Sequence, residues 1–302
     1  MIVILGGHGY VGQALQKTLA LQAIPFQILS RRSLNYTSEP ILTEFLRDHR
    51  PEFLINAAGY TGRPNVDACE LHRAECLEGN ALLPGIVRAA CEKTGTPWGH
   101  VSSGCIYTGQ HADGGGFRES DPPNFSFRQN NCSFYSGCKA LGEELLAGAE
   151  NCFIWRLRIP FNELDGPRNY ISKMMRYDCL LNATNSLSQL DEFAAACVAC
   201  WTNRVPWGTY NLTNPGAVTT KDVVFLIRRW GLTNRTLRFF ESEEQFMQSA
   251  AKTPRSNCVL DTRKAESAGI RMRPIDEALE NAMQRWSTFT SVRTSEPAAA
   301  LT

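Results

Sequence analysis

The 302-residue chain has no hydrophobic run near the length of about 20 residues that a membrane-spanning helix needs, so we expect no membrane span. It also lacks an excess of either charge, because 31 basic and 30 acidic residues leave a formal net charge of +1. This balance predicts that nucleic acid is not a partner. The apolar start at residues 1–5 has neither the basic segment nor the cleavage site of a secretory signal, which favours a cytoplasmic protein. Internal repeats and low-complexity segments are absent from the sequence.

Cysteine is abundant, but its pattern argues against a disulfide framework. The chain has 11 cysteines, an odd number, scattered through a long sequence and partly within apolar helical stretches. This usage is typical of reduced thiols in a cytoplasmic protein. The Cys-x-x-Cys pair of Cys197 and Cys200 has no second pair and no nearby histidine, so we expect buried packing and no metal site.

The first part of the chain alternates short apolar runs with amphipathic patterns. This alternation predicts a parallel sheet covered by helices on both faces. The sequence predicts strands at residues 2–5, 26–29, 53–56, 100–102 and 153–158, and helices at 13–22, 41–49, 66–91, 134–149, 191–202, 220–230, 243–251 and 275–286. Residues 109–131, rich in Gly, Asp, Pro and Asn, are predicted to form a long loop.

A glycine-rich segment joins the first predicted strand to the first helix. Gly6, Gly9 and Gly12 form a GxxGxxG pattern that also includes Tyr10 and Val11. The glycines allow a tight turn, a close approach of a pyrophosphate and close helix–strand packing, while the phosphates meet the free amides of the helix N-terminus. We therefore predict that this loop binds a dinucleotide.

The end of the second strand indicates which dinucleotide is bound. Proteins that bind NAD usually place an acidic residue here, whereas this chain has Ser30, Arg31 and Arg32. Two guanidinium groups suit the 2′-phosphate of NADP. We predict NADP as the cofactor, with NADPH preferred and NADH as the weaker alternative.

Tyr135 and Lys139 form a YxxxK pair near the start of a predicted helix, so both side chains lie on one face. The lysine charge is expected to lower the pKa of the tyrosine, as proton-transfer chemistry requires. Ser103 ends a predicted sheet strand, where its hydroxyl can hold a substrate carbonyl oxygen beside the tyrosine.

These motifs together resemble the extended short-chain dehydrogenase/reductases that act on nucleotide sugars. The resemblance extends over residues 1–285 and includes the segments 56–67, 103–107, 133–136, 166–173, 211–216 and 254–257. Within that class the chain is similar to the nucleotide-rhamnose synthases, which combine 3,5-epimerase and 4-reductase activities, and to the dTDP-4-dehydrorhamnose reductases. The resemblance implies an enzyme that converts UDP- or dTDP-4-keto-6-deoxyglucose to the L-rhamnose nucleotide with NADPH.

The resemblance also implies residue roles. Cys105 would act as the base and Lys173 as the acid of epimerisation. Tyr135 would protonate the alkoxide of reduction, Ser103 would orient it and Lys139 would hold the nicotinamide ribose. The expected cofactor contacts include Asn56, Ala57 and Ala58, and the expected substrate contacts are Arg63, Asn65, Cys105, Asn169 and Arg255.

The alternatives left open are a 4-reductase without epimerase activity, a 3,5-epimerase, and a non-catalytic NADP-binding regulatory subunit. Ala68, Ser103 and the long loop at 109–131 depart from the family pattern. The plant relatives often carry this module fused to a dehydratase, so a separate enzyme would supply the keto-sugar. The resemblance also suggests a homodimer.

The predicted fold is α/β, a doubly wound parallel (Rossmann) sheet with a smaller mixed α/β substrate lobe. The cofactor domain is expected to comprise residues 1–160 and about 185–212. The substrate lobe is expected to comprise about 161–184 and 213–288, followed by a frayed tail at 289–302.

Overall fold

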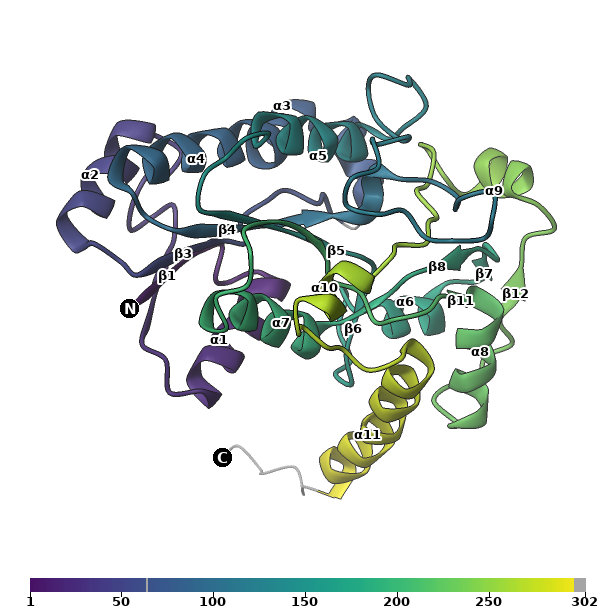
Figure 1. Cartoon of the computed structure of the whole chain (residues 1–302). Helices are drawn as coiled ribbons and strands as arrows, with labels where there is room; N and C mark the ends of the chain where they lie inside the picture. The colour runs from purple at the N-terminus through teal and green to yellow at the C-terminus, as the bar shows by residue number, and fades with distance from the viewer. Residues whose placement is uncertain (64, 296–302) are drawn as a thin grey trace, which may run out of the picture.

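Short, mostly apolar strands form one parallel six-stranded sheet in the order β10-β5-β4-β3-β1-β2 (Figure 1). The computed structural model describes residues 1–63 and 65–295. All four residues of β1 and of β3 are buried, as expected for central strands covered on both faces. The strands are β1 (Ile2–Leu5), β2 (Phe26–Leu29), β3 (Phe53–Asn56), β4 (Trp98–Ser103), β5 (Cys152–Leu157) and β10 (Gly208–Asn211).

Helices cover both faces of this sheet (Figure 1). On one face lie α1 (Tyr10–Leu21) and α7 (Leu190–Thr202). The opposite face carries α2 (Glu39–His49), α4 (Leu83–Thr94) and α5 (Phe134–Leu145). Cys197 and Cys200 are fully buried in the apolar core between α7 and the sheet, so this pair packs as expected. The arrangement confirms the predicted doubly wound α/β fold.

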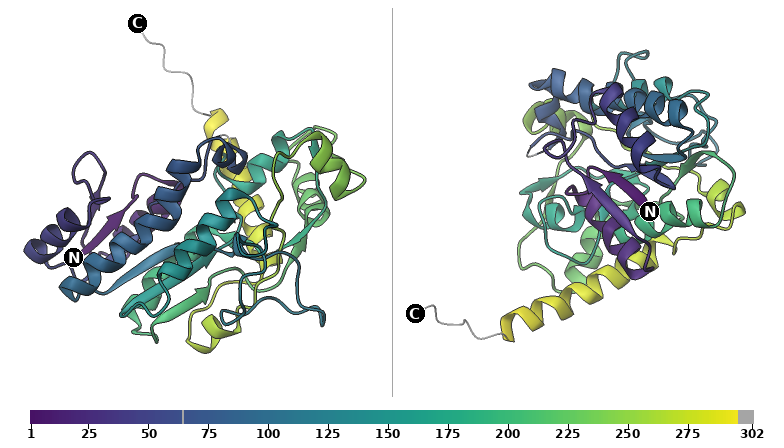
Figure 2. Two further views of the ribbon diagram at one scale, coloured as in Figure 1. Left: turned by 90° about the horizontal axis from the view of Figure 1, so that it is seen from above. Right: turned by 90° about the vertical axis from the view of Figure 1, so that its left-hand side faces the viewer.

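A smaller lobe lies beyond the carboxyl ends of the strands, at the end of the molecule away from the N-terminus (Figures 1 and 2). It has a separate apolar core, in which Phe161 and Leu187 pack with residues of α8 (Thr220–Arg229) and α11 (Ile275–Ser295). Strand β6 (Pro160–Phe161), which follows β5, pairs with β9 (Ser188–Gln189), which precedes α7. The remaining elements are β6 (Pro160–Phe161), α6 (Tyr170–Arg176), β7 (Cys179–Leu180), β8 (Thr184–Asn185), β9 (Ser188–Gln189), β11 (Val218–Thr219), α8 (Thr220–Arg229), β12 (Arg238–Phe239), α9 (Glu243–Ser249), α10 (Arg263–Ser267) and α11 (Ile275–Ser295).

The prediction of one continuous helix over residues 66–91 is wrong. This segment contains a 3₁₀ helix, η1 (Val66–Glu70), then α3 (Arg73–Leu77), a π-helical turn, η2 (Glu78–Leu82), and α4. The π-helical turn directs the Asn80 side chain at the loop after β3, where it accepts a hydrogen bond from the Tyr60 amide (3.2 Å) and donates one to the Tyr60 carbonyl (2.6 Å). Local helical periodicity does not reveal this non-local requirement.

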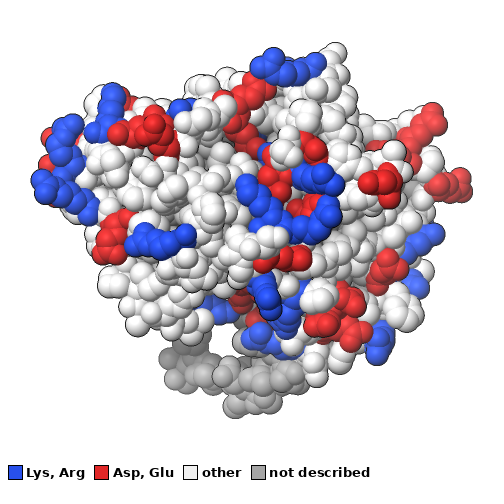
Figure 3. All heavy atoms as spheres, in the orientation of Figure 1, with Lys and Arg blue, Asp and Glu red and all other residues white. Residues whose placement is uncertain are grey.

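The C-terminal helix α11 continues to Ser295, beyond the predicted end at residue 286, so residues 289–295 of the predicted frayed tail are helical. Residues 296–302 of that tail lie outside the described residues. No helix in the described ranges is both long and apolar enough to cross a membrane. Basic and acidic side chains are intermixed on the face shown in Figure 3, in keeping with the small net charge.

Candidate active site

The glycine-rich loop packs so closely on neighbouring backbone that side chains would not fit at Gly6 and Gly12. Gly6 has φ +74°, and a Cβ built there would lie 2.5 Å from the Ala58 amide nitrogen. At Gly12 a Cβ would lie 2.3 Å from the Gly6 carbonyl oxygen, so a side chain would separate the loop from the helix. The N-cap residue of α1, Gly9, offers no side-chain cap, which leaves the first amides of α1 available to an anion.

Ser30 follows β2 and forms a tight turn with Ser33. Its hydroxyl accepts from the Ser33 amide (3.1 Å), and its own amide donates to the Ser33 hydroxyl (3.0 Å). Arg31 and Arg32 project from this turn as exposed side chains, with no ion pair to any described residue. Two free guanidinium groups beside the glycine-rich loop fit the predicted 2′-phosphate site.

The loop after β3 forms another wall of the site. The fully buried Asn56 accepts a hydrogen bond from the Ala58 amide (3.1 Å) and lies 3.2 Å from Nδ1 of His100 on β4. The amide of Ala57 donates to the Leu5 carbonyl (3.0 Å), so these residues hold the loop rather than present side chains to a ligand. Burial and the nearby charge of Lys139 keep the pKa of His100 far below its ordinary value.

Ser103, Cys105 and Tyr135 come together where β4 ends and α5 begins. Ser103 caps the short 3₁₀ turn η3 (Gly104–Ile106) by accepting a hydrogen bond from the Cys105 amide (3.2 Å). Burial raises the pKa of both the Cys105 thiol and the Tyr135 phenol, while the nearby Ser103 hydroxyl opposes this rise in each group. The three side chains therefore form one contiguous polar group.

The protonation of Tyr135 differs from the expectation based on the YxxxK spacing. Burial, together with the charges of neighbouring cysteines, raises the pKa of Tyr135 well above its ordinary value. The predicted lowering by Lys139 is wrong in this structure, because desolvation penalises the phenolate more than nearby groups stabilise it. Tyr135 is a neutral phenol at neutral pH and can donate a proton.

Lys139 lies beneath the loop that follows β3. Only 6% of Lys139 is exposed, and its Nζ donates a long hydrogen bond to the Val101 carbonyl (3.4 Å). A Cβ built at Gly59 would be 3.7 Å from this Nζ, which places the ammonium beside the loop after β3. Burial lowers the pKa of Lys139, although Cys105 and Glu143 favour its charged form.

Lys173 lies on α6, in the smaller lobe. It is partly buried, and its Nζ makes no hydrogen bond or ion pair with the described residues. Burial and the charge of Arg168 lower its pKa. An amine with these properties can exchange protons more readily than an ordinary surface lysine.

Asn169 caps α6 and has a structural role in this chain. It is fully buried, and its Oδ1 accepts from the Ile171 amide (3.0 Å). Its Nδ2 donates to the Asn162 carbonyl (2.8 Å), Asn162 Oδ1 (2.8 Å) and the Leu164 carbonyl (2.7 Å). These contacts hold the loop that carries Lys173, and they leave no free donor for the substrate contact that we predicted.

Arg255 and Asp67 connect the smaller lobe to the sheet domain. The guanidinium donates two hydrogen bonds to the carboxylate, at 2.6 and 2.7 Å, and both side chains are partly buried. Asn65 caps η1 by accepting from the Asp67 amide (2.9 Å), whereas Arg63 is exposed. Of the predicted substrate contacts in this region, Arg63 faces solvent, whereas Asn65 and Arg255 are hydrogen-bonded to Asp67.

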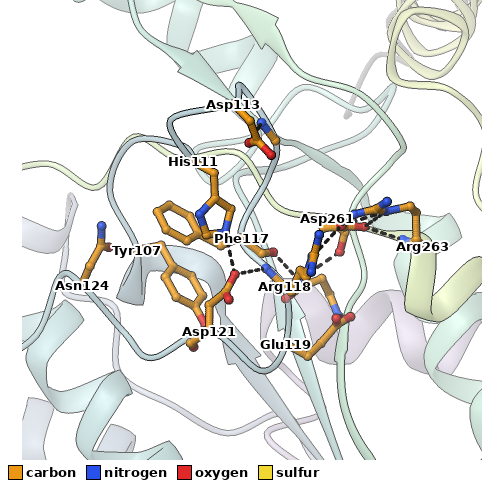
Figure 4. Close-up of polar contacts among 12 residues, drawn as sticks. Tyr107, His111, Asp113, Phe117, Arg118, Glu119, Asp121, Asn124, Asp261 and Arg263 are labelled. Carbon is orange, nitrogen blue, oxygen red and sulfur yellow. Dashed lines mark hydrogen bonds and ion pairs between the residues drawn. The ribbon is translucent and has the colours of Figure 1, made fainter.

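The long loop after η3 is fixed by stacking and polar contacts (Figure 4). The rings of Tyr107 and Phe117 stack with centroids 4.6 Å apart. Asp121 accepts from His111 Nε2 (2.7 Å) and from the Arg118 amide (2.6 Å). Residues 109 and 117 also form bridges with residues 258 and 260, so this loop, predicted correctly as irregular, is anchored to the C-terminal part of the chain.

Sequence reasoning missed several residues that support the site. Asn80 anchors the loop after β3, and Arg158 packs behind η3. Glu143 and Arg156 form a buried ion pair, with N–O distances of 2.7–3.1 Å. The sequence offered one indication that Glu143 supports the site. Its i, i+4 spacing from Lys139 places both side chains on the same face of α5.

A dinucleotide cradle, a capping serine, a neutral tyrosine and a buried lysine define an enzyme of the short-chain dehydrogenase/reductase type. The chain belongs to the RmlD substrate binding domain family, whose profile matches residues 1–288. This membership confirms the resemblance drawn from the motifs.

Comparisons with individual proteins place the chain among enzymes named for rhamnose synthesis. It is 34% identical over 282 residues to a bifunctional dTDP-4-dehydrorhamnose 3,5-epimerase/dTDP-4-dehydrorhamnose reductase of Arabidopsis thaliana, covering 92% of this chain and 90% of that protein. A trifunctional Arabidopsis thaliana protein, named as a UDP-glucose 4,6-dehydratase, UDP-4-keto-6-deoxy-D-glucose 3,5-epimerase and UDP-4-keto-L-rhamnose-reductase, is 33% identical, and the chain covers 40% of its length.

Two solved structures show the same fold. The crystal structure of a UDP-rhamnose synthase from Acanthamoeba polyphaga mimivirus superposes with a TM-score of 0.85 at 26% identity, covering 94% of this chain and 98% of that chain. A dTDP-4-dehydrorhamnose reductase from Bacillus anthracis, solved in complex with NADP, has a TM-score of 0.78 at 18% identity, covering 95% and 98% of the two chains.

Proposed function

We propose that this protein is a nucleotide-sugar 3,5-epimerase/4-reductase. It would convert UDP- or dTDP-4-keto-6-deoxyglucose to the L-rhamnose nucleotide with NADPH. The observation that carries this proposal is the position of Cys105, whose amide donates to the Ser103 hydroxyl (3.2 Å) in the turn that packs against the start of α5, where Tyr135 lies. A reductase needs the tyrosine and serine, whereas a second proton-transfer group beside them suits an enzyme that also inverts the carbons next to the ketone.

The cofactor site is proposed to lie between the glycine-rich loop and the loop after β3. The first amides of α1 would bind the pyrophosphate, and Arg31 and Arg32 would bind the 2′-phosphate. NADPH supplies a hydride when bound. Lys139, whose Nζ lies beside the loop after β3, would hold the nicotinamide ribose.

Reduction of the ketone needs a proton for the oxygen at C4. Tyr135 can provide it, because its raised pKa keeps the phenol protonated at neutral pH. Ser103 lies near that phenol and can orient the oxygen toward it. The same pair can polarise the ketone during epimerisation, since a hydrogen bond to the carbonyl oxygen stabilises the enolate.

Epimerisation requires a base on one face of the sugar ring and an acid on the other. Cys105 is proposed as the base and Lys173 as the acid. Cys105 belongs to the sheet domain and Lys173 to the smaller lobe, so a sugar bound between them can meet both. Burial and the charge of Arg168 lower the pKa of Lys173 from its ordinary value, which favours proton transfer.

The test follows each half-reaction separately in heavy water. The purified protein is incubated with UDP- and dTDP-4-keto-6-deoxyglucose, and mass spectrometry records deuterium in the sugar before and after NADPH is added. We expect deuterium uptake without NADPH and a rhamnose nucleotide with it. Cys105→Ser and Lys173→Met are expected to abolish the uptake but to retain reduction of a substrate that has already been epimerised.

Cys132→Ser is the matched control, because Cys132 is a half-buried thiol near Cys105 to which we assign no role. Reduction without prior deuterium uptake would contradict the epimerase proposal and leave a 4-reductase. Tight NADPH binding with no turnover of either keto-sugar would favour the non-catalytic regulatory subunit.

A further inference from the structure

Arg158 is a buried cation that the proposed mechanism does not use. It follows β5, and 5% of it is exposed. Its guanidinium donates to Asn185 Oδ1 (2.6 Å) and to the Ser256 carbonyl, both of which are uncharged. Its Nε is buried without a hydrogen-bond partner, and no described carboxylate pairs with it.

The neighbouring Arg156 shows how unusual this arrangement is. Arg156 is equally buried, but the carboxylate of Glu143 neutralises it at 2.7 Å. A buried charge without an opposite charge is costly, because the protein interior solvates it poorly. An anion that forms beside Arg158 would therefore be stabilised strongly.

The side chain of Arg158 lies against the turn that carries Cys105. A Cβ built at Gly104 would lie 3.5 Å from Arg158 Cδ. Its positive charge acts to lower the pKa of three nearby groups, the thiols of Cys105 and Cys258 and the phenol of Tyr170. Of these, Cys105 is the one that hydrogen bonds to the catalytic serine, Ser103.

We propose that Arg158 is a positioning residue that stabilises the thiolate of Cys105 for proton abstraction from the sugar, a role that rests on the proposed epimerase function. The charged and titratable groups near Cys105 are Lys139, Tyr135, Cys132 and Arg158. Burial raises the pKa of the Cys105 thiol, and the charges of Arg158 and Lys139 and the hydroxyls of Ser103 and Ser136 oppose that rise. Among the two cations, Lys139 is assigned to the cofactor, whereas Arg158 has no other charged partner in the described chain.

The proton transfer balances within the site. The C–H bond next to the ketone breaks and an S–H bond forms on Cys105, while the electron pair moves to the carbonyl oxygen as an enolate. The ammonium of Lys173 then gives its proton to the opposite face of that carbon, and the electron pair returns to re-form the ketone. Solvent restores both groups, which is why deuterium enters the sugar.

The test measures the ionisation of Cys105 directly. Iodoacetamide alkylation of the full-length protein is followed against pH, and the modified peptides are resolved by mass spectrometry. Arg158→Gln is expected to raise the pH midpoint of Cys105 alkylation by about 1 unit or more. Arg158→Lys keeps the charge and is expected to remain close to the unmodified protein.

Cys179, a partly exposed thiol on β7 in the smaller lobe, is the internal control for the alkylation chemistry in the same samples, and its modification should not differ between the variants. Deuterium uptake at neutral pH should fall about tenfold in Arg158→Gln for a midpoint shift of one unit. Reduction of already epimerised substrate should be retained. Arg158→Met provides a second uncharged variant if the glutamine variant does not fold.

An unchanged Cys105 midpoint in a folded, uncharged variant would overturn the role of Arg158. An equal loss of deuterium uptake in Arg158→Lys would also overturn it, because a variant that keeps the charge but loses activity indicates a packing role. Absence of deuterium uptake by the unmodified protein would contradict the proposed epimerase function instead, and the alkylation profile would still decide whether Arg158 stabilises the thiolate.

Discussion

The hydroxyl of Tyr10, at the start of α1, donates a hydrogen bond to Oδ1 of Asn162 in the smaller lobe, at 3.1 Å. The same oxygen accepts from Nδ2 of Asn169 at 2.8 Å, and Asn169 caps the helix that carries Lys173. Two hydrogen bonds through Asn162 therefore connect Tyr10 with Asn169, the N-cap residue of the helix that carries Lys173.

Replacing Asn162 should destabilise the protein and uncouple these two parts of the site. Asn162→Leu leaves the buried donors of Tyr10 and Asn169 without their shared acceptor, so we expect a loss of about 1–3 kcal/mol in the free energy of unfolding. Urea unfolding measures this loss. Tyr10→Phe removes one of the bonds and leaves no unpaired donor on Tyr10, so a loss of equal size in that variant would contradict the argument.

The raised pKa of Tyr135 predicts the pH dependence of ketone reduction. A donor phenol must be protonated, and a pKa above the ordinary value keeps it so up to a higher pH. The rate of the chemical step should therefore not decline because of Tyr135 between pH 7 and about 10. Single-turnover kinetics with already epimerised substrate measure this step.

In the same assay Tyr135→Phe should lower the rate about 10²–10⁴-fold. Tyr210→Phe is the matched control, because its hydroxyl donates to the Pro206 carbonyl in a part of the sheet domain outside the proposed site. A fall in rate with a midpoint near pH 7 that disappears in Tyr135→Phe would show that the phenol ionises earlier than burial predicts.

Arg31 and Arg32 should decide the preference for NADPH. Arg31→Ala combined with Arg32→Ala is expected to weaken NADPH binding by about 1.5–3 kcal/mol, since hydrogen bonds to a charged phosphate are lost. NADH binding should change little. Fluorescence titration of the bound nicotinamide measures both affinities, with the exposed Arg47→Ala as the control for a change in surface charge. Equal losses for the two cofactors would place the 2′-phosphate elsewhere.

The ion pair of Arg255 with Asp67 should compete with the diphosphate of the substrate. If Arg255 binds that diphosphate, Asp67→Asn removes the competing carboxylate and should tighten nucleotide-sugar binding several-fold. Arg255→Met should weaken binding about tenfold or more, by loss of a charge-assisted hydrogen bond. Calorimetric titration with UDP measures both changes. Weaker binding in Asp67→Asn would show that the ion pair itself orders the site.

The sequence was sufficient for the features that depend on local pattern. Strands β1, β2 and β3 have the predicted bounds, because apolar runs between turn residues identify buried parallel strands. Strand β10 (Gly208–Asn211) was missed, since it has no apolar run and two of its four residues are only partly buried. Its pairing with β5, and not its own composition, makes it a strand.

The site was predictable in its motifs but not in its connections. Ser103, Cys105 and Tyr135 meet as their order along the chain suggested. The charge of Arg158 is uncompensated because no described carboxylate pairs with it and its Nε has no hydrogen-bond partner. The structural role of Asn169 comes from the loop carbonyls of Asn162 and Leu164, to which its side chain donates. Such facts arise only when distant segments pack together, and the roles assigned to the individual site residues stay predictions.

The bridges between the long loop and residues 257–260 have a consequence for how the protein forms during synthesis. The Gly109 amide donates to the Asn257 carbonyl, and the Ser256 hydroxyl donates to the Tyr107 carbonyl at 2.6 Å. The turn that carries Cys105 is therefore completed by a segment made about 150 residues later. A nascent chain can assemble most of its sheet on the ribosome, but its proton-transfer centre stays open until residues 256–261 have emerged.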